Sequence, residues 1–106
     1  MRTLKFIVEG QSIKKDPTCD FSGLIPGTEG YLKAEFSFSQ EWDGCAKVAA
    51  FYSAMGDEYP AQVLYDGRTC NIPAEALKNR VFKFKLLGKK SKFKITTNKF
   101  EVKQNG

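Results

Sequence analysis

The sequence predicts an all-β fold, an antiparallel β-sandwich of Ig-like or jelly-roll-like type with about six to eight short strands and one short helical connector. Hydrophobic residues recur with a period of two along most of the chain, which is the spacing of strands. Clusters of Gly, Pro, Asn and Asp separate these segments, as turns do. With 106 residues, 42% of them hydrophobic and 13% aromatic, the chain is expected to form a single domain over residues 1–106.

The first strand is expected in the segment TLKFIVE, where Leu4, Phe6 and Val8 share one face. Residues 10–30 follow with four of the nine glycines and two of the four prolines, so they should be largely loop, with a short pairing at Ser12–Lys14. A connection of this length in a small domain is usually functional or part of an interface.

Two further strands are expected in the segments YLKAEFSFS and CAKVAAFYS. In the first, every second residue from Leu32 to Phe38 is apolar, so that face should point to the core. The second is largely apolar throughout, which is typical of a central strand. Gly44 lies in the turn between them and is expected to adopt a positive φ.

The segment YPAQVLYDGRTCNI is expected to form a β-hairpin, because Asp66-Gly67 is a pair that type I′ turns prefer. Pro60 has no N–H to donate and should lie at a strand end or on an edge. The segment PAEALKN predicts the helical connector, with Pro73 in its first turn. A two-residue turn would place Val63 opposite Cys70 and Ala61 opposite Ile72, all on one apolar face.

Residues 81–95, VFKFKLLGKKSKFKI, hold six lysines and three phenylalanines, a mixture typical of surfaces that stack bases and neutralise phosphates. The alternation nevertheless separates rings from charges, which favours a hairpin whose rings face the core and whose lysines coat the exterior. An acidic partner surface, protein or nucleic acid, is the functional alternative. With a loop centred on Lys89-Lys90, the expected cross-strand pairs are Leu86–Phe93, Phe84–Ile95 and Lys85–Lys94.

The net charge of +5 is concentrated in the second half of the chain. Residues 1–53 carry six basic and seven acidic side chains, whereas residues 54–106 carry eleven basic and five acidic ones. Trp42 is either an interface anchor or a plug at the rim of the sandwich. The candidate partner-binding residues are therefore Trp42, Lys83, Lys85, Lys89, Lys90, Lys92 and Lys94.

The chain lacks most of the residue arrangements that enzymes commonly use for catalysis. There is no histidine, which removes the commonest general base and the usual zinc ligand, and the carboxylates Glu41, Asp43 and Asp57-Glu58 lie in turn-like segments. Gly27–Gly30 is not followed by the GK[ST] sequence of a phosphate-binding loop. We therefore expect no enzymatic activity, no metal and no cofactor.

Cysteine spacing and hydropathy indicate in which cellular compartment the protein is expected. The three cysteines lack CxxC spacing, so we expect buried or idle thiols rather than a disulfide framework. No run of 18 apolar residues and no signal-like segment occurs, so neither a membrane span nor a membrane partner is expected, and synthesis should take place in a cytoplasm.

Several motifs carry a resemblance to a known family. They are S-x-E-W-x-G at 39–44, K-x-A-x-F at 47–51, T-C-x-I-P at 69–73 and T-T-N at 96–98, with an acidic-Gly turn between the second and third. In this order, over residues 4–103, the chain resembles a β-domain of virion proteins from phages and prophages of Gram-positive bacteria. It is similar to the N-terminal region of upper-baseplate (tail-appendage) proteins.

The resemblance implies a β-sandwich that attaches an appendage to a particle or oligomerises within one. The leading hypothesis is thus a non-enzymatic phage structural protein, a decoration, fibre-base or baseplate adaptor subunit, located in the virion and assembled in the host cytoplasm. Its expected partners are other virion subunits and further copies of itself, reached through sheet edges, the 10–30 loop and Trp42. Two alternatives stay open: a small phage-encoded inhibitor that binds a host defence protein through the basic hairpin, and a nucleic-acid-binding β-domain.

Overall fold

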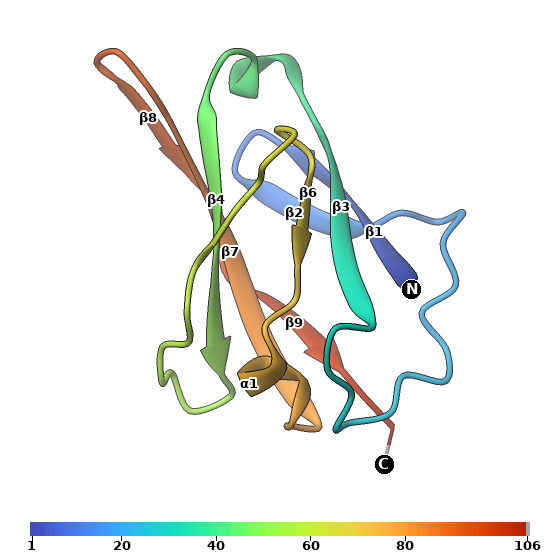
Figure 1. Ribbon diagram of the computed structural model, residues 1–106. Coiled ribbons are helices and arrows are strands. Elements are labelled where there is room, and N and C mark those ends of the chain that lie inside the picture. Colours follow the sequence, from blue (N-terminus) through green and yellow to red (C-terminus); the bar gives the residue numbers. More distant parts are fainter. Residues whose placement is uncertain (106) are drawn as a thin grey trace.

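The computed structural model describes residues 1–105 and places them in two β-sheets packed face to face (Figure 1). The four-stranded sheet has the order β2-β1-β3-β6. In the five-stranded sheet the order is β5-β4-β7-β8, and β9 pairs with the first half of β7. The predicted all-β, sandwich-like fold is confirmed.

The four-stranded sheet contains β1 (Arg2–Glu9), β2 (Ser12–Lys15), β3 (Leu32–Phe38) and β6 (Thr69–Asn71). The five-stranded sheet contains β4 (Ala46–Ser53), β5 (Gln62–Val63), β7 (Val81–Lys90), β8 (Phe93–Thr96) and β9 (Phe100–Lys103). Residues 1–105 thus hold nine strands, one more than the upper end of the predicted range. The helical elements are a 3₁₀ turn, η1 (Gln40–Trp42), and the predicted connector, α1 (Ala74–Leu77).

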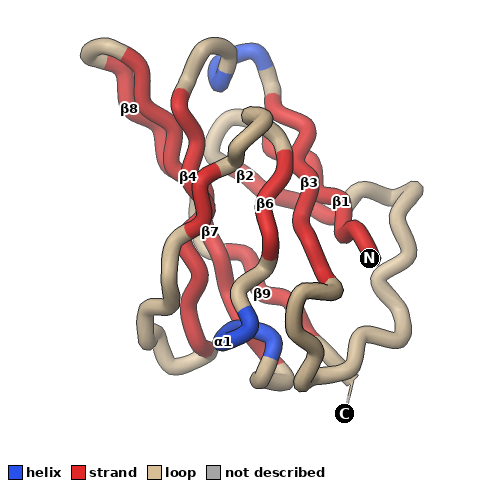
Figure 2. Tube along the Cα trace, viewed as in Figure 1, coloured by secondary structure: helices blue, strands red, loops and turns tan. Residues whose placement is uncertain are grey.

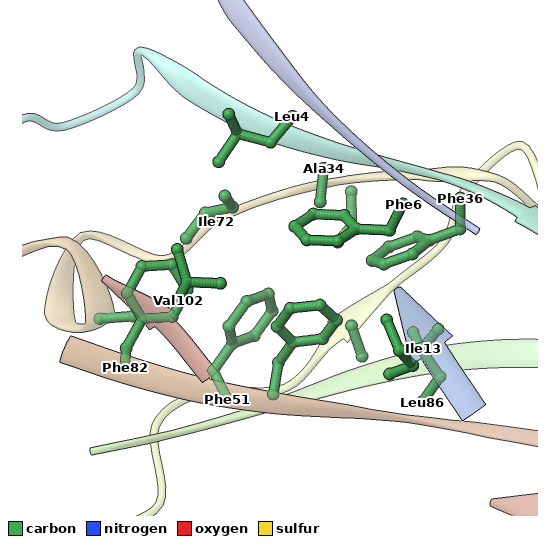
Figure 3. Close-up of a cluster of buried hydrophobic side chains, with 14 of the residues drawn as sticks. Leu4, Phe6, Ile13, Ala34, Phe36, Phe51, Ile72, Phe82, Leu86 and Val102 are labelled. Carbon is green, nitrogen blue, oxygen red and sulfur yellow. The ribbon is translucent and has the colours of Figure 1, made fainter. Parts of the chain in front are cut away.

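The core forms where the inner faces of the two sheets meet (Figure 3). Alternation places the predicted residues there: Phe6 and Phe36 from one sheet and Phe82 and Phe84 from the other are all buried. The ring of Phe6 meets that of Phe84 edge to face, with centroids 5.0 Å apart. Burial of each such ring contributes about 1.5–3 kcal/mol, so these side chains are sufficiently explained by packing.

One pair of strands corrects the prediction of a purely antiparallel sandwich. β1 and β3 are parallel, in a register that runs from Arg2 opposite Leu32 to Val8 opposite Phe38. A parallel pair needs a crossover of a dozen or more residues, and residues 16–31 supply it without a helix. Topology therefore accounts for the length of this loop, and the expected short pairing before it is present as β2.

The predicted hairpin between residues 59 and 72 is wrong. β5 pairs with β4 and β6 pairs with β3, so the segment passes from one sheet to the other. Cys70 and Ile72 are buried as expected, whereas Ala61 and Val63 are exposed. The two halves of the segment consequently do not share an apolar face.

The turn at Asp66-Gly67 also differs from the predicted type I′ turn. Gly67 donates its N–H to the Leu64 carbonyl at 2.9 Å and has a φ of 77°, but Asp66 does not have the positive φ that type I′ requires. The Asp66 carboxylate instead accepts the N–H groups of Arg68 and Thr69. These bonds redirect the chain toward the other sheet.

The remaining expectations for local structure agree with the fold. β4 lies between β5 and β7, as its apolar sequence predicted. Gly44 has a φ of 77° in the turn that precedes it. Pro60 is exposed just before β5, and Pro73 caps α1.

Candidate functional site

The outward face of the five-stranded sheet is dominated by lysine. Cross-strand pairing puts Lys83 beside Glu101 and Lys89 beside Lys94 on this side, and the bridge between Tyr52 and Glu58 adds a second carboxylate at its edge. We call these outward side chains the lysine face; its cations are Lys83, Lys85, Lys89, Lys94, Lys99 and Lys103.

Both carboxylates of the lysine face lie in one row, at the level of Tyr52. Glu101 forms an exposed ion pair with Lys103, with 3.8 Å between the charged atoms. Among the described residues, the outward side chains on the other side of Lys85, toward the tip of β8, include Lys89 and Lys94 and no carboxylate. Such a field attracts acidic partners and speeds their association.

An apolar row crosses the lysine face. Val63, Val48, Leu87 and Thr96 are successive cross-strand neighbours on β5, β4, β7 and β8. Val63 is 68% exposed, and Val48 and Leu87 are half-buried. A row of exposed apolar side chains beside lysines offers both burial and charge pairing to a partner, the combination found at protein interfaces.

The end of the β7–β8 hairpin projects beyond the sandwich (Figures 1 and 2). We call residues 88–96 the basic arm. The tip turn is Ser91-Lys92, not Lys89-Lys90 as predicted, so Lys90 rather than Leu86 faces Phe93. Exposed lysines of the arm are Lys89, Lys90, Lys92 and Lys94.

This register corrects three further predictions. Lys85 lies opposite Ala50, not opposite Lys94. Ile95 lies opposite Gly88, not opposite Phe84. Phe93 does not reach the core: it is 40% exposed, and the Lys90 Nζ lies 5.5 Å from the centre of its ring. The arm therefore presents one aromatic ring among its lysines.

Trp42 fixes the base of the arm. It is fully buried, its Nε1 donates to the Gly10 carbonyl at 2.8 Å, and its ring packs on Phe38 with centroids 5.0 Å apart. β7 passes over the indole at Gly88, where a Cβ would lie 2.8 Å from two ring carbons. Of the two roles considered for Trp42, the rim plug fits, because the indole has no exposed face for a partner.

A shallow groove of about 420 Å³ separates the basic arm from the β1–β2 turn. Gly10 and Gln11 form one side and Phe93–Thr96 the other, and Glu41 contributes a wall. Hydrogen bonding to the Ser39 side chain lowers the pKa of Glu41, so this carboxylate is ionised at neutral pH. The groove thus joins apolar, cationic and anionic groups in one small space.

Two lysines of the lysine face, Lys99 and Lys85, also pack on the ring of Tyr52, which explains part of their placement. Tyr52 points outward yet is only 8% exposed, because the Nζ atoms of Lys99 and Lys85 lie 4.0 Å and 5.8 Å from its ring centre. Cation–π contacts of this kind contribute about 0.5–1 kcal/mol at exposed sites. Lys99 and Lys103 were missed from the sequence, although alternation along the last strand would have placed Lys103 outward.

The outward face of the four-stranded sheet provides a contrast. Lys5 lies beside Glu35, and Lys14 forms an ion pair with Glu9 at 3.1 Å. Opposite charges are interspersed on that face, as on an ordinary solvated surface. The single-sign field is therefore particular to the five-stranded sheet.

The cysteines do not form a reactive centre in residues 1–105. Cys45 and Cys70 are buried and Cys19 is half-buried, all as free thiols. Burial raises the pKa of Cys70 to about 12, which keeps this thiol neutral at pH 7. Within the described part of the chain, no three His, Cys, Asp or Glu side chains are grouped to hold a metal, and none of the helices is long and apolar enough to cross a membrane.

Comparison of the chain with protein-family models, with curated proteins and with solved structures gave no match. Fold and surface together define the class of protein as a small all-β, sandwich-like domain with one strongly basic face.

Proposed function

We propose that this protein is a non-enzymatic docking subunit that binds an acidic protein surface through its lysine face and basic arm. The observation that carries the proposal is the run of positive charge without a carboxylate beside the apolar row of Val63, Val48 and Leu87. Charge of one sign steers a partner to the surface, and the apolar row supplies area to bury.

The setting we propose is a phage virion, where the subunit would join an appendage, a fibre base or a decoration to its neighbours. The support for this setting is the motif resemblance. Trp42 of the S-x-E-W-x-G motif and Phe51 of the K-x-A-x-F motif are core residues, so the motifs support the proposal at the level of fold. The proposed docking role rests on the lysine face.

The test uses particles induced from the bacterial strain that carries the gene, with the protein quantified by mass spectrometry. The variant Lys89→Glu/Lys92→Glu/Lys94→Glu reverses three of the four exposed charges of the arm. The matched control, Lys5→Glu/Lys14→Glu/Lys15→Glu, makes the same change of charge on the four-stranded sheet. Wild type and control should be present at fixed stoichiometry, and the arm variant should be lost at least ten-fold.

Retention of the arm variant at wild-type stoichiometry would contradict the role of the lysine face. Absence of the wild-type protein from particles would contradict the virion setting and redirect the search to an acidic host protein. Thermal unfolding of both variants, compared with wild type, separates lost docking from lost folding.

Nucleic-acid binding is a second candidate because of Phe93. This ring is 40% exposed and lies among arm lysines, the arrangement that stacks bases. It is a single ring, however, since Phe82 and Phe84 are buried. A gel-shift assay with single-stranded DNA at 20 and 200 mM salt decides: binding at low salt that Phe93→Ala weakens supports this function, and no shift at 20 mM excludes it.

A further inference from the structure

We propose that the free edge of β8 binds an extended acidic segment of the partner as an additional strand. This inference rests on the proposed docking function and names the chemistry and geometry of the partner. The support for strand addition is independent of charge, because it comes from the hydrogen-bonding direction of β8 and from the groove beside it; the lysines specify that the segment is acidic.

β8 is the end of its sheet in the described chain, with β7 on one side and no strand on the other. The N–H of Thr97 donates to the Leu86 carbonyl at 3.0 Å, so the backbone of residues 93, 95 and 97 is directed at β7. In an antiparallel ladder the intervening residues are directed the opposite way. The N–H and C=O of Lys94 and the N–H of Thr96 therefore face outward.

A side chain confirms this direction. Gln11 donates from Nε2 to the Thr96 carbonyl at 3.0 Å, which requires that carbonyl to point away from β7. It occupies one acceptor at the end of the edge and leaves both groups of Lys94 open to a partner backbone. Exposed edges of this kind are how several peptide-binding domains add a strand.

The surroundings of the edge specify the side chains of the added strand. Residues that alternate toward the groove would lie beside Phe93 and Ile95, which favour apolar side chains, and the ionised Glu41 disfavours an acid there. Residues that alternate toward the lysine face would lie beside Lys94, with Lys89 one strand further away on β7. The partner segment therefore alternates acidic and apolar residues.

Charge also decides against a second copy as the occupant. Antiparallel pairing of two β8 edges through their outward Lys94 groups would bring the two Lys94 side chains close together, and like charges across strands are destabilising. Lysines on an edge strand prevent self-association in this way. An acidic strand at the same edge would instead be attracted by these lysines.

The test uses fluorescein-labelled heptapeptides with blocked ends, measured by fluorescence anisotropy at 50 mM salt. The parent peptide alternates glutamate and valine. Its composition control groups the same residues in two blocks, and its charge control replaces glutamate by lysine. We expect the parent to bind at least ten-fold more tightly than either control.

N-methylation of the peptide backbone tests the mode of binding. Methyl groups on three glutamate amides, or on three valine amides, give two isomers of equal charge, and an added strand directs only one of these sets toward β8. One isomer should bind like the parent and the other should lose at least ten-fold. Equal binding of both isomers would overturn strand addition while leaving the docking function intact.

Two protein variants report on the same edge. Lys94→Pro removes the outward N–H and the charge, whereas Lys94→Ala removes the charge alone. The proline variant should bind the parent peptide at least five-fold more weakly than the alanine variant, and the Lys94 amide of wild type should gain hydrogen-exchange protection with peptide. Tighter binding of single-stranded DNA than of the parent peptide, or an unprotected Lys94 amide in the complex, would overturn the inference.

Discussion

Gly88 is the residue at which the arm and the core meet. Its missing side chain lets β7 cross directly over the Trp42 indole; an added Cβ would lie 2.8 Å from two ring carbons and 3.1 Å from the Ile95 Cγ2. Overpacking of this kind costs about 1–3 kcal/mol. We therefore expect Gly88→Ala to lower the free energy of unfolding by that amount, measured by chemical denaturation.

The neighbouring position provides the control for Gly88. Lys89 is exposed, and Lys89→Ala should stay within about 0.5 kcal/mol of wild type, as surface substitutions usually do. Equal stability of the two variants would show that Trp42 and the arm move apart without cost.

The buried thiol of Cys70 predicts a pH dependence of the free energy of unfolding. Burial, with a smaller contribution from the Asp66 carboxylate, raises the pKa of this thiol to about 12. An unfolded chain releases the proton near its ordinary pKa of about 8.5, so between pH 9 and 12 the unfolded state binds fewer protons than the native state. The free energy of unfolding should therefore fall as pH rises through this window.

Cys70→Ala isolates the contribution of the thiol to that pH dependence. The variant loses stability at every pH through its smaller side chain, but its stability should decline less steeply above pH 9 than that of wild type. Parallel curves from pH 7 to 11 in urea denaturation would contradict the assignment.

At the scale of elements, the turn of the arm is strained at one position. Ser91 has a φ of 48°, the single positive value outside glycine in residues 1–105. A side chain in this region costs roughly 1 kcal/mol, and glycine avoids the clash. Ser91→Gly should thus slow hydrogen exchange of the arm amides, whereas Lys92→Gly, where φ is not positive, should speed it. The reverse order would contradict this account of the turn.

Alternation predicted the face of most strands but not their partners. It assigned the buried sides of β1, β3 and β7 correctly, because a core-facing period of two survives in any sheet. It misplaced β5 and β6, since an Asp-Gly pair fits both a hairpin and a crossing between sheets. Parallel pairing of β1 and β3 had no local signal except the length of the loop between them.

The register error in the arm has a similar cause. Phe93 was expected opposite Leu86 and lies opposite Lys90, a shift of an even number of residues. An even shift keeps every side chain on its predicted face, so periodicity does not detect it. In the observed register the two-residue turn falls at Ser91-Lys92, where Ser91 takes a positive φ, and Gly88 lies opposite Ile95.

At the scale of the whole molecule, the fold converts a charge difference along the sequence into one between surfaces. The basic second half supplies β7, β8 and β9, which lie in one sheet, so its lysines gather on one face. The mixed first half supplies β1, β2 and β3 of the other sheet. The sequence identified the candidate residues Lys83, Lys85, Lys89 and Lys94. It did not predict that Val48 and Val63 lie on the same face, because that depends on how the strands pair.

This arrangement predicts that added salt stabilises the protein. Residues 1–105 contain two ion pairs, both exposed and hence weak, while Lys89 and Lys94 repel across the arm. Raising NaCl from 10 to 150 mM shortens the screening length to about 8 Å, which weakens this repulsion. We expect the melting temperature to rise by about 1–4 °C, measured by calorimetry.

Two variants test the cause of this increase. Lys94→Gln should raise the melting temperature at 10 mM NaCl and reduce its increase with salt. Lys14→Gln removes an attraction to Glu9 and should make the increase of the melting temperature with salt larger. A melting temperature that falls with salt, or the same slope in both variants, would show that repulsion on the lysine face does not govern the stability of the molecule.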